Sequence, residues 1–312
     1  MKNCGRLFVF AGYDKDEIID DTLLHYLNNL SDFGDIVLII DSNIGDSELS
    51  KLKPIKNLLF IVAERHNEYD FGSYKRGYQY ALKQKILKNY DWIYFINDSV
   101  YGPLWGLKPI FDTLESQEKD FVGIVDYSEK NVARHIQSWF FGVSQRIAME
   151  KFFSEFMNNI TKQPTKSLII LKYEVGLSQL ICQHGYNIAT YVSSENGDIC
   201  HSMYNAPLLM LKKGIPFVKK AAISELKHFA YLYQFAPDCI LDIIYKHAQR
   251  TGILLSKDLD IGDPYKYEKC FRFTLFAIPL ITIYQKKQRE TCCYKTYIFD
   301  KIPLLKVFAK KL

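Results

Sequence analysis

The sequence has no apolar run long enough to cross a bilayer. Runs such as Leu7–Ala11 and Ile36–Ile40 fall well short of the roughly 18 residues that a membrane-spanning helix needs. The N-terminal residues show no hydrophobic signal-peptide region, which favours a cytoplasmic protein. The seven cysteines are odd in number and form no CxxC pair, so we expect buried free thiols rather than a disulfide framework.

Charge is unevenly distributed along the chain. Hydrophobic residues at 48% and charged residues at 24% are ordinary for a globular protein and exclude a disordered or collagen-like chain. Residues 266–312 hold 11 Lys or Arg and 3 Asp or Glu, so the first 265 residues carry a net charge of −3. The sequence lacks the basic stripe with interleaved aromatic residues that is typical of nucleic-acid-binding proteins, so we expect no nucleic-acid partner. The basic tail either meets an anionic membrane surface or is simply solvated.

Apolar runs alternate with stretches of helical periodicity, and this predicts a parallel sheet covered by helices. The predicted strands are Arg6–Gly12, Asp35–Asp41, Leu58–Ala63, Trp92–Ile96, Phe121–Val125 and Phe140–Ser144. The predicted helices are Asp16–Leu30, Ser73–Leu87, Arg146–Ile160, Leu168–His184 and Ser224–Gly252.

The tail contains a repeat. Thr274–Tyr284 returns 24 residues later as Ile298–Phe308, with Pro279 and Pro303 in register. Two copies are too few for a solenoid, which needs about three units. We expect short extended or amphipathic segments that either enter a membrane interface or pack onto the main domain.

Three predicted strands end in turns with small or acidic residues: Ala11–Asp14, Asp41-Ser42 and Asn97-Asp98-Ser99. Ligands of open α/β sheets bind beyond the carboxyl ends of strands, so we expect a site here. None of these turns is a GxGxxG or GxxxxGK(S/T) loop, which argues against a dinucleotide oxidoreductase or a P-loop kinase. A carboxylate such as that of Asp98 can bind a hard cation when phosphates of a substrate complete the coordination shell. The alternative is that Asn, Asp and Ser stand here only because these residues are favoured in turns.

A second cluster of candidate residues follows in Asn67–Gly77. Gly72 and Gly77 would let the backbone approach a ligand, and a helix that begins near Ser73 would offer free N–H groups to an anion. Lys75 and Arg76 add positive charge, which together suits a diphosphate. The alternative is an ordinary capped helix with solvated basic residues.

Several motifs in this order resemble the rhamnan synthesis F family of bacterial cell-surface polysaccharide enzymes, and the chain is also similar to GT-A glycosyltransferases. They are NEYDFGSYKRGY, INDSVYGPL, DFVGIVD, HIQSWFFGVS, YEVGLSQ and GIPFVKK, within about residues 6–223. The resemblance implies an α/β fold of GT-A type, a Rossmann-type mixed sheet flanked by helices, with a C-terminal helical and basic extension. Residues 1–223 would form the nucleotide-sugar-binding and catalytic domain and residues 224–312 the extension.

The resemblance also implies an activity. It is that of an inverting glycosyltransferase that moves a sugar, for example L-rhamnose, from a nucleoside diphosphate donor to a surface polysaccharide or lipopolysaccharide. A lipid-linked acceptor would place the protein peripherally at the inner face of the cytoplasmic membrane. The usual Asp-x-Asp turn is Asn97-Asp98-Ser99 here, so a Mg²⁺ or Mn²⁺ cofactor would meet a single carboxylate. The alternative is a sugar- or nucleotide-binding protein on the same fold that has lost catalysis.

By position, the resemblance assigns the donor, metal and acceptor residues. The donor-binding residues would be Ala11, Tyr13, Asp41, Asp70, Gly72, Arg76 and Asp98, and the metal ligands Asp98 and His201. For His201 a role without metal is the alternative. The acceptor-binding residues would be His135, Gln137 and Trp139, with core packing as the alternative for Trp139.

The resemblance places the general base at Glu174, at the start of a predicted helix. There a carboxylate can deprotonate the acceptor hydroxyl. The positive end of the helix dipole would keep Glu174 ionised. The alternative is that Glu174 occupies a first helical turn simply because acidic residues are favoured there.

Overall fold

A computed structural model gives the fold. It describes residues 5–129, 132–193, 202–226, 232, 234–253, 268–275, 278–287, 291–298 and 302–310. The chain divides into two units. One comprises Met1–Leu226 and Tyr233–Leu254, and the other comprises Lys227–Leu232 and Leu255–Leu312.

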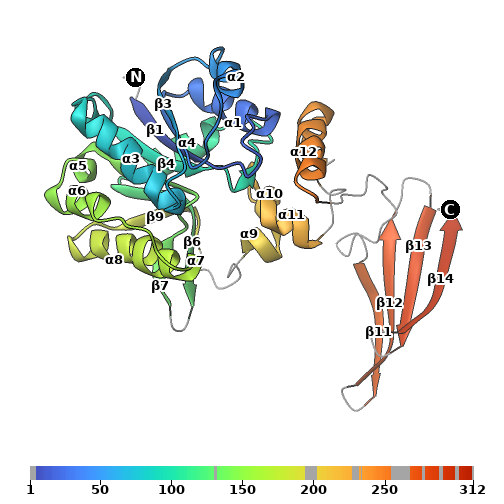
Figure 1. Ribbon diagram of the computed structural model, residues 1–312. Coiled ribbons are helices and arrows are strands. Elements are labelled where there is room, and N and C mark those ends of the chain that lie inside the picture. Colours follow the sequence, from blue (N-terminus) through green and yellow to red (C-terminus); the bar gives the residue numbers. More distant parts are fainter. Residues whose placement is uncertain are drawn as a thin grey trace. The chain divides into compact units, whose positions relative to one another are not determined.

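A mixed sheet forms the centre of the first unit (Figure 1). Its strands are β1 (Arg6–Gly12), β2 (Asp35–Ile40), β3 (Leu58–Ala63), β4 (Trp92–Asn97), β6 (Phe121–Glu129), β7 (Val132–Ile136), β8 (Phe140–Ser144) and β9 (Ile188–Val192). The strand order is β3-β2-β1-β4-β8-β6-β7, and β9 pairs with β6. β1 to β4 run parallel, whereas β8 is antiparallel to β4 and β6. The predicted mixed α/β fold is confirmed.

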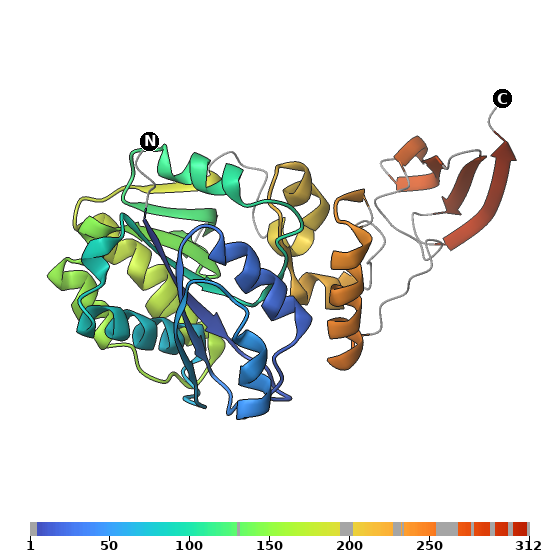
Figure 2. The same ribbon diagram turned by 90° about the horizontal axis from the view of Figure 1, so that it is seen from above.

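Helices lie on both sides of this sheet (Figures 1 and 2). The α-helices are α1 (Asp21–Ser31), α2 (Asp46–Leu49), α3 (Tyr69–Lys83), α4 (Lys108–Glu115), α5 (Gln145–Ala148), α6 (Lys151–Asn158), α7 (Lys166–Ile169), α8 (Gly176–Gln183), α9 (Ser202–Asn205), α10 (Pro207–Lys212), α11 (Lys220–Leu226) and α12 (Asp238–Arg250). The chain also forms two 3₁₀ turns, η1 (Ser50–Leu52) and η2 (Leu87–Asn89), and a π-helical segment, η3 (Ile170–Val175).

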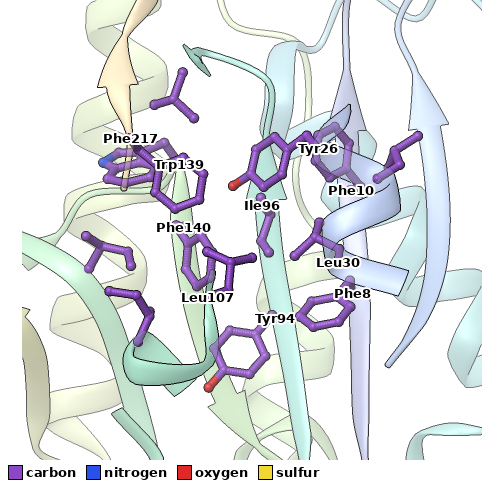
Figure 3. Packing of buried hydrophobic residues seen from close by; sticks show 14 of the residues in the cluster. Phe8, Phe10, Tyr26, Leu30, Tyr94, Ile96, Leu107, Trp139, Phe140 and Phe217 are labelled. Atoms are coloured by element: carbon purple, nitrogen blue, oxygen red, sulfur yellow. The ribbon is translucent and has the colours of Figure 1, made fainter. Parts of the chain in front are cut away.

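The central strands are buried on both faces, because each face packs against helices. In β1, Phe8 and Phe10 join the hydrophobic cluster that includes residues of α1 and α4, whereas Leu7 and Val9 join the one that includes residues of α3 and α6. Figure 3 shows the first of these clusters. Strands buried on both faces form near-continuous apolar runs, which is why the sequence predicts them well. Each fully buried large apolar side chain contributes about 1.5–3 kcal/mol.

Helix α3 begins one turn earlier than predicted. The sequence favoured a start near Ser73, but α3 begins at Tyr69. Lys75 and Arg76 therefore lie in its second turn, away from the free N–H groups, and the predicted arrangement of an anion site at this helix start is wrong. Lys75 donates instead to the carbonyl of Ile160, at 2.8 Å.

The C-terminal residues form helices and a second sheet. The predicted helix Ser224–Gly252 is two helices, α11 and α12, with Pro237 directly before α12. Four antiparallel strands follow in the order β11 (Glu268–Leu275), β12 (Ile278–Lys287), β13 (Thr291–Ile298) and β14 (Ile302–Lys310). Pro279 and Pro303 are the second residues of β12 and β14, and each pairs next to a register shift. The repeat thus contains two equivalent strand starts, and the expected extended segments are confirmed.

Within the described residues, none of the helices combines the length and the apolar character that crossing a membrane requires.

Candidate active site

A cavity of about 1040 Å³ opens beyond the carboxyl ends of β1, β2 and β4. Nine of the predicted site residues line it: Ala11, Tyr13, Asp41, Asp70, Asp98, His135, Gln137, Trp139 and Glu174. They come from strand ends, from the start of α3, from the β7–β8 region and from η3. The fold therefore brings residues up to 163 positions apart in the chain to one cavity.

Three predicted residues are placed differently. Arg76 does not line the cavity, and its Nη1 donates to Glu68 Oε2 at 2.5 Å and to the carbonyl of Gly72 at 2.9 Å. Gly72 also lies outside the lining, and a Cβ added there would meet Glu68 Cβ at 2.3 Å. Gly72 thus serves the close packing of this loop. His201 lies outside the described residues.

Glu174 lies within a continuous helical segment, not at its start. The segment begins with α7 at Lys166, passes through η3 and ends with α8 at Gln183. The predicted position at a helix N-terminus is therefore wrong, and the helix dipole is not the cause of ionisation. A π-helical turn widens the backbone spiral locally, and such turns are frequent at functional sites.

Hydrogen bonds keep Glu174 ionised. The backbone N–H of Ser138 donates to its Oε2 at 2.6 Å, and His135 Nε2 lies 3.3 Å from its Oε1. Burial by itself would raise the pKa of Glu174, but the bonds from His135 and Ser138 outweigh it and hold the pKa below its ordinary value. The result is a carboxylate in the cavity wall whose side chain is only 13% exposed.

His135 is the charged partner of Glu174. Its Nδ1 bonds the carbonyl of Ala133 at 2.8 Å, and a carbonyl can only accept, so Nδ1 carries a proton. Donation from Nε2 to Glu174 then requires the imidazolium. Burial lowers the pKa of His135, but the contact with Glu174 and the bond to Ala133 raise it above its ordinary value overall. Both ring nitrogens are thus occupied by protein groups.

Trp139 belongs to the core as well as to the cavity wall. It is 2% exposed, and its ring lies 5.5 Å from that of Phe217 (Figure 3). Its indole N–H donates to Gln137 Oε1 at 3.2 Å.

Tyr13, by contrast, is 50% exposed, and the guanidinium of Arg65 lies 4.9 Å from its ring centroid. Tyr13 is therefore accessible to a ligand in the cavity.

Asp41 shapes the loop between β3 and α3. Its Oδ1 accepts hydrogen bonds from the backbone N–H groups of His66 at 2.7 Å and Asn67 at 2.9 Å. Asn67 and Tyr69 have positive φ angles of 58° and 57°, a conformation that costs free energy in residues other than glycine. Both line the cavity. Asp41 thus holds a strained loop against the cavity.

A chain of hydrogen bonds runs through the Asn97-Asp98-Ser99 turn. Asn97 Nδ2 donates to Asp70 Oδ2 at 2.9 Å, and Ser99 Oγ donates to Asn97 Oδ1 at 2.6 Å. Lys219 Nζ then donates to Ser99 Oγ at 2.9 Å. Lys219 is 6% exposed and lines the cavity, and the sequence-based interpretation missed it. The available signal was a lysine directly after the apolar run Ile215–Val218.

The cavity fits a divalent cation only in part. Asn97 Oδ1 and Ser99 Oγ already accept hydrogen bonds in the chain to Lys219, so the turn offers one carboxylate, that of Asp98. Burial raises the pKa of Asp98, although Lys220 counteracts this. A cation would have to take its remaining ligands from water or from phosphates of a substrate.

Another group of ligand atoms could hold a cation outside the cavity. In the described part of the chain, Asp14, Asp20 and His247 have ligand atoms within 4.8 Å of one another. Arg250 of α12 already pairs with Asp14 at 2.5 Å and with Asp20 at 3.0 Å. This group therefore holds α12 beside α1, as Figure 2 also shows.

Comparison with known proteins gives one family match and a few relatives. The family model described as rhamnan synthesis protein F matches residues 36–283. Virulence protein VirA of Vibrio anguillarum is 29% identical over 186 residues, which cover 57% of this chain and 56% of VirA. The uncharacterized protein y4gN of Sinorhizobium fredii is 20% identical over 186 residues, 59% of this chain and 48% of y4gN. The chain thus spans about half the length of the curated relatives it matches.

Solved structures show only a weak likeness. The mannosyltransferase Ktr4p from S. cerevisiae has a TM-score of 0.34 at 9% identity, over 50% of this chain and 59% of Ktr4p. Core-mannan synthase A from Aspergillus fumigatus, in its Mn/GDP form, has a TM-score of 0.31 at 8% identity, over 57% of this chain and 69% of the synthase. Scores this low carry no argument about ligands or activity.

Proposed function

The chain belongs to the rhamnan synthesis protein F family, a family of glycosyltransferases, and we propose that it transfers a sugar from a nucleoside diphosphate donor to a bacterial cell-surface glycan. L-Rhamnose is the candidate sugar that the family description suggests. The observation that carries this proposal is the position of an ionised, nearly buried carboxylate, Glu174, in the same cavity as the strand-end residue Asp98.

In the proposed reaction, Glu174 acts as the general base. An acceptor hydroxyl attacks the anomeric carbon, and the bond from that carbon to the diphosphate oxygen breaks. The diphosphate leaves with the bonding electron pair, and the acceptor proton moves to a carboxylate oxygen of Glu174. Attack from the face opposite the leaving group inverts the anomeric configuration. Ser138 and His135 act as positioning groups because they fix the direction of the carboxylate.

For the donor, we assign the strand-end side of the cavity. Tyr13, with its exposed ring, and Asp41 would contact the base and ribose. Asp70 accepts a hydrogen bond from Asn97. Asp98 would hold a Mg²⁺ or Mn²⁺ ion, which would supply positive charge to offset the negative charge of the leaving group. Arg76, which pairs with Glu68, is not needed for this assignment.

For the acceptor, we assign the side of the cavity formed by Gln137 and Trp139, close to Glu174. Gln137 offers a side-chain amide that can bond acceptor hydroxyls, and the indole N–H of Trp139 holds this amide in place. The acceptor itself, a polysaccharide or a lipid-linked glycan, is part of the proposal. With a lipid-linked acceptor, the basic residues of 266–312 would hold the protein at an anionic membrane surface.

The experiment compares Glu174→Gln with the unaltered protein in donor hydrolysis and sugar transfer. We expect the rate to fall by about 10²–10⁴-fold, the usual contribution of a general base, with donor affinity retained. Glu155→Gln, at an exposed carboxylate of α6, is the matched control and should have no effect. If the donor binds but neither the unaltered protein nor any variant turns it over, the chain is a nucleotide-sugar-binding protein and the proposed activity is wrong.

A further inference from the structure

Lys219 is a buried lysine in the lining of the cavity. It is 6% exposed, and within the described residues its ammonium donates one hydrogen bond, to the neutral hydroxyl of Ser99. An ammonium has three donors. Two aromatic rings also lie near it, with Trp139 at 5.1 Å and Tyr204 at 6.0 Å from Nζ to the ring centroid. None of the ion pairs found in the described part of the chain includes Lys219.

Burying such a charge costs free energy unless an anion accompanies it. Burial lowers the pKa of Lys219 to about 7, although Glu174 and Asp70 raise it in part. Lys166, which lines the same cavity, lowers it further by repulsion. Lys166 thus adds a second positively charged group to the lining, which an anion in the cavity could meet.

The fold fixes Lys219 beside the acidic turn. β10 (Val218–Lys219) pairs antiparallel with β5 (Val100–Tyr101), so that Lys219 lies opposite Val100. The backbone N–H of Lys220 donates to the carbonyl of Ser99 at 3.0 Å. A Cβ at Gly102 would meet the carbonyl of Pro216 at 2.5 Å, so only glycine lets these two segments approach. The ammonium is therefore preorganised.

The residue that binds Lys219 is also informative. Ser99 occupies the position where an Asp-x-Asp turn would have its second carboxylate, and its hydroxyl holds a lysine instead. The amine of Lys219 thus lies near the carboxylate of the same turn, Asp98, whose charge acts on it. An anion that binds beside this amine would favour its charged form, whether a metal is present or not.

We infer that Lys219, assisted by Lys166, binds the diphosphate of the donor directly, so that nucleoside diphosphate binding persists when divalent cations are removed. The inference rests on the proposed function, because it names the group that holds the donor there. Lys219 is a donor-binding residue in this account, and Asp98 with its cation adds to the same charge balance.

The test measures binding of UDP, GDP and dTDP by calorimetry, each in EDTA and in MnCl₂. We expect at least one nucleotide to bind the unaltered protein in EDTA. Lys219→Met should weaken that binding about 10- to 100-fold, the loss expected for one charge-assisted hydrogen bond, and Lys219→Arg should restore part of it. Lys213→Met, at an exposed lysine of the same segment, is the matched control and should bind normally.

Manganese distinguishes diphosphate binding from a structural role. In Lys219→Met we expect manganese to restore binding in part, and the additional change Asp98→Asn to abolish that rescue. If Lys219 only offsets the neighbouring carboxylates, Lys219→Met would lower the melting temperature and leave nucleotide affinity unchanged, which would overturn the inference.

Two results separate the inference from the proposed function. If EDTA abolishes binding to the unaltered protein while manganese supports it, the inference is wrong and the proposed function stands. If none of the three nucleotides binds in either condition, the proposed function fails and the inference fails with it.

Discussion

Two sets of hydrogen-bonded charged residues organise the cavity at the residue scale. His135 and Glu174 form one pair, and the chain from Asp70 through Asn97 and Ser99 to Lys219 forms the other. Each set holds a charged group in a nearly buried position, where electrostatic interactions are stronger than in water. The first set supplies an ionised carboxylate, and the second a lysine amine whose charged form a bound anion would favour.

The His135–Glu174 pair predicts a pH-dependent stability. The pKa of His135 is raised, so its contribution is complete below the ordinary value of 6.5 and is lost as pH rises through the folded-state pKa. The pKa of Glu174 is lowered, so its contribution is present above the ordinary value of 4.5 and is lost as pH falls through its folded-state pKa. The pair therefore stabilises the protein most between about pH 4.5 and 6.5.

We expect His135→Asn to lower the free energy of unfolding by about 1–3 kcal/mol at pH 5.5, because Glu174 loses its charged partner. At a pH above the folded-state pKa of His135 the loss should be smaller. Urea denaturation at several pH values measures both, and His184→Asn, at an exposed histidine, is the control. An equal loss at every pH would show that the pair is not charged.

Some of these residues could be predicted from the sequence and others could not. Asp98 and Asp41 follow directly after buried strands, a position that the apolar pattern marks. The environment of Glu174 could not be predicted, because Ser138 and His135 approach it from another part of the chain. Lys219 was missed for the same reason: only the pairing of β10 with β5 brings it to the turn.

At the scale of elements, the close contact of α3 with β1 positions one side of the cavity. Gly77 of α3 lies against Val9 of β1, and a Cβ added to Gly77 would meet Val9 Cγ1 at 2.3 Å. Gly77 therefore serves this helix–strand contact and does not line the cavity, where the sequence had suggested an approach to a ligand. β7 and β9 escaped prediction because they are short and only partly buried, which weakens their apolar pattern.

This contact predicts opposite effects for two helical glycines. Gly77→Ala should destabilise the protein by about 1–3 kcal/mol, because the added methyl group overpacks the α3–β1 interface. Gly176→Ala, at the start of α8, would meet nothing closer than the carbonyl of Leu171 at 3.7 Å. It should stabilise the protein by about 0.5–1 kcal/mol through helix propensity. Chemical denaturation measures both, and a stabilising Gly77→Ala would contradict the packing described here.

At the scale of the whole molecule, the family match covers parts of both units, and the basic residues are concentrated in the C-terminal one. The family match runs to residue 283 and so reaches into β12, beyond the region of about residues 6–223 that the motifs indicated. The second sheet could not be predicted from its sequence beyond the repeat, because two copies define equivalent segments but not how they pair. The excess of basic residues in 266–312 belongs to this part of the chain.

The basic excess predicts binding to anionic vesicles. We expect the full chain to co-sediment with phosphatidylglycerol vesicles and not with phosphatidylcholine vesicles, because each basic residue near an anionic surface contributes about 1 kcal/mol. Binding should weaken as salt rises. Changing Lys286, Lys287 and Arg289 together to Gln should reduce it. Equal binding to both vesicle types would contradict an electrostatic role for the tail.

The most direct measurement of the central claim is a crystal structure of the full chain with the nucleoside diphosphate that binds it. The account predicts that the nucleotide occupies the cavity lined by Asp98 and Glu174, with its diphosphate against Lys219 and its base beside Tyr13. A nucleotide bound elsewhere, with this cavity filled only by solvent, would contradict it.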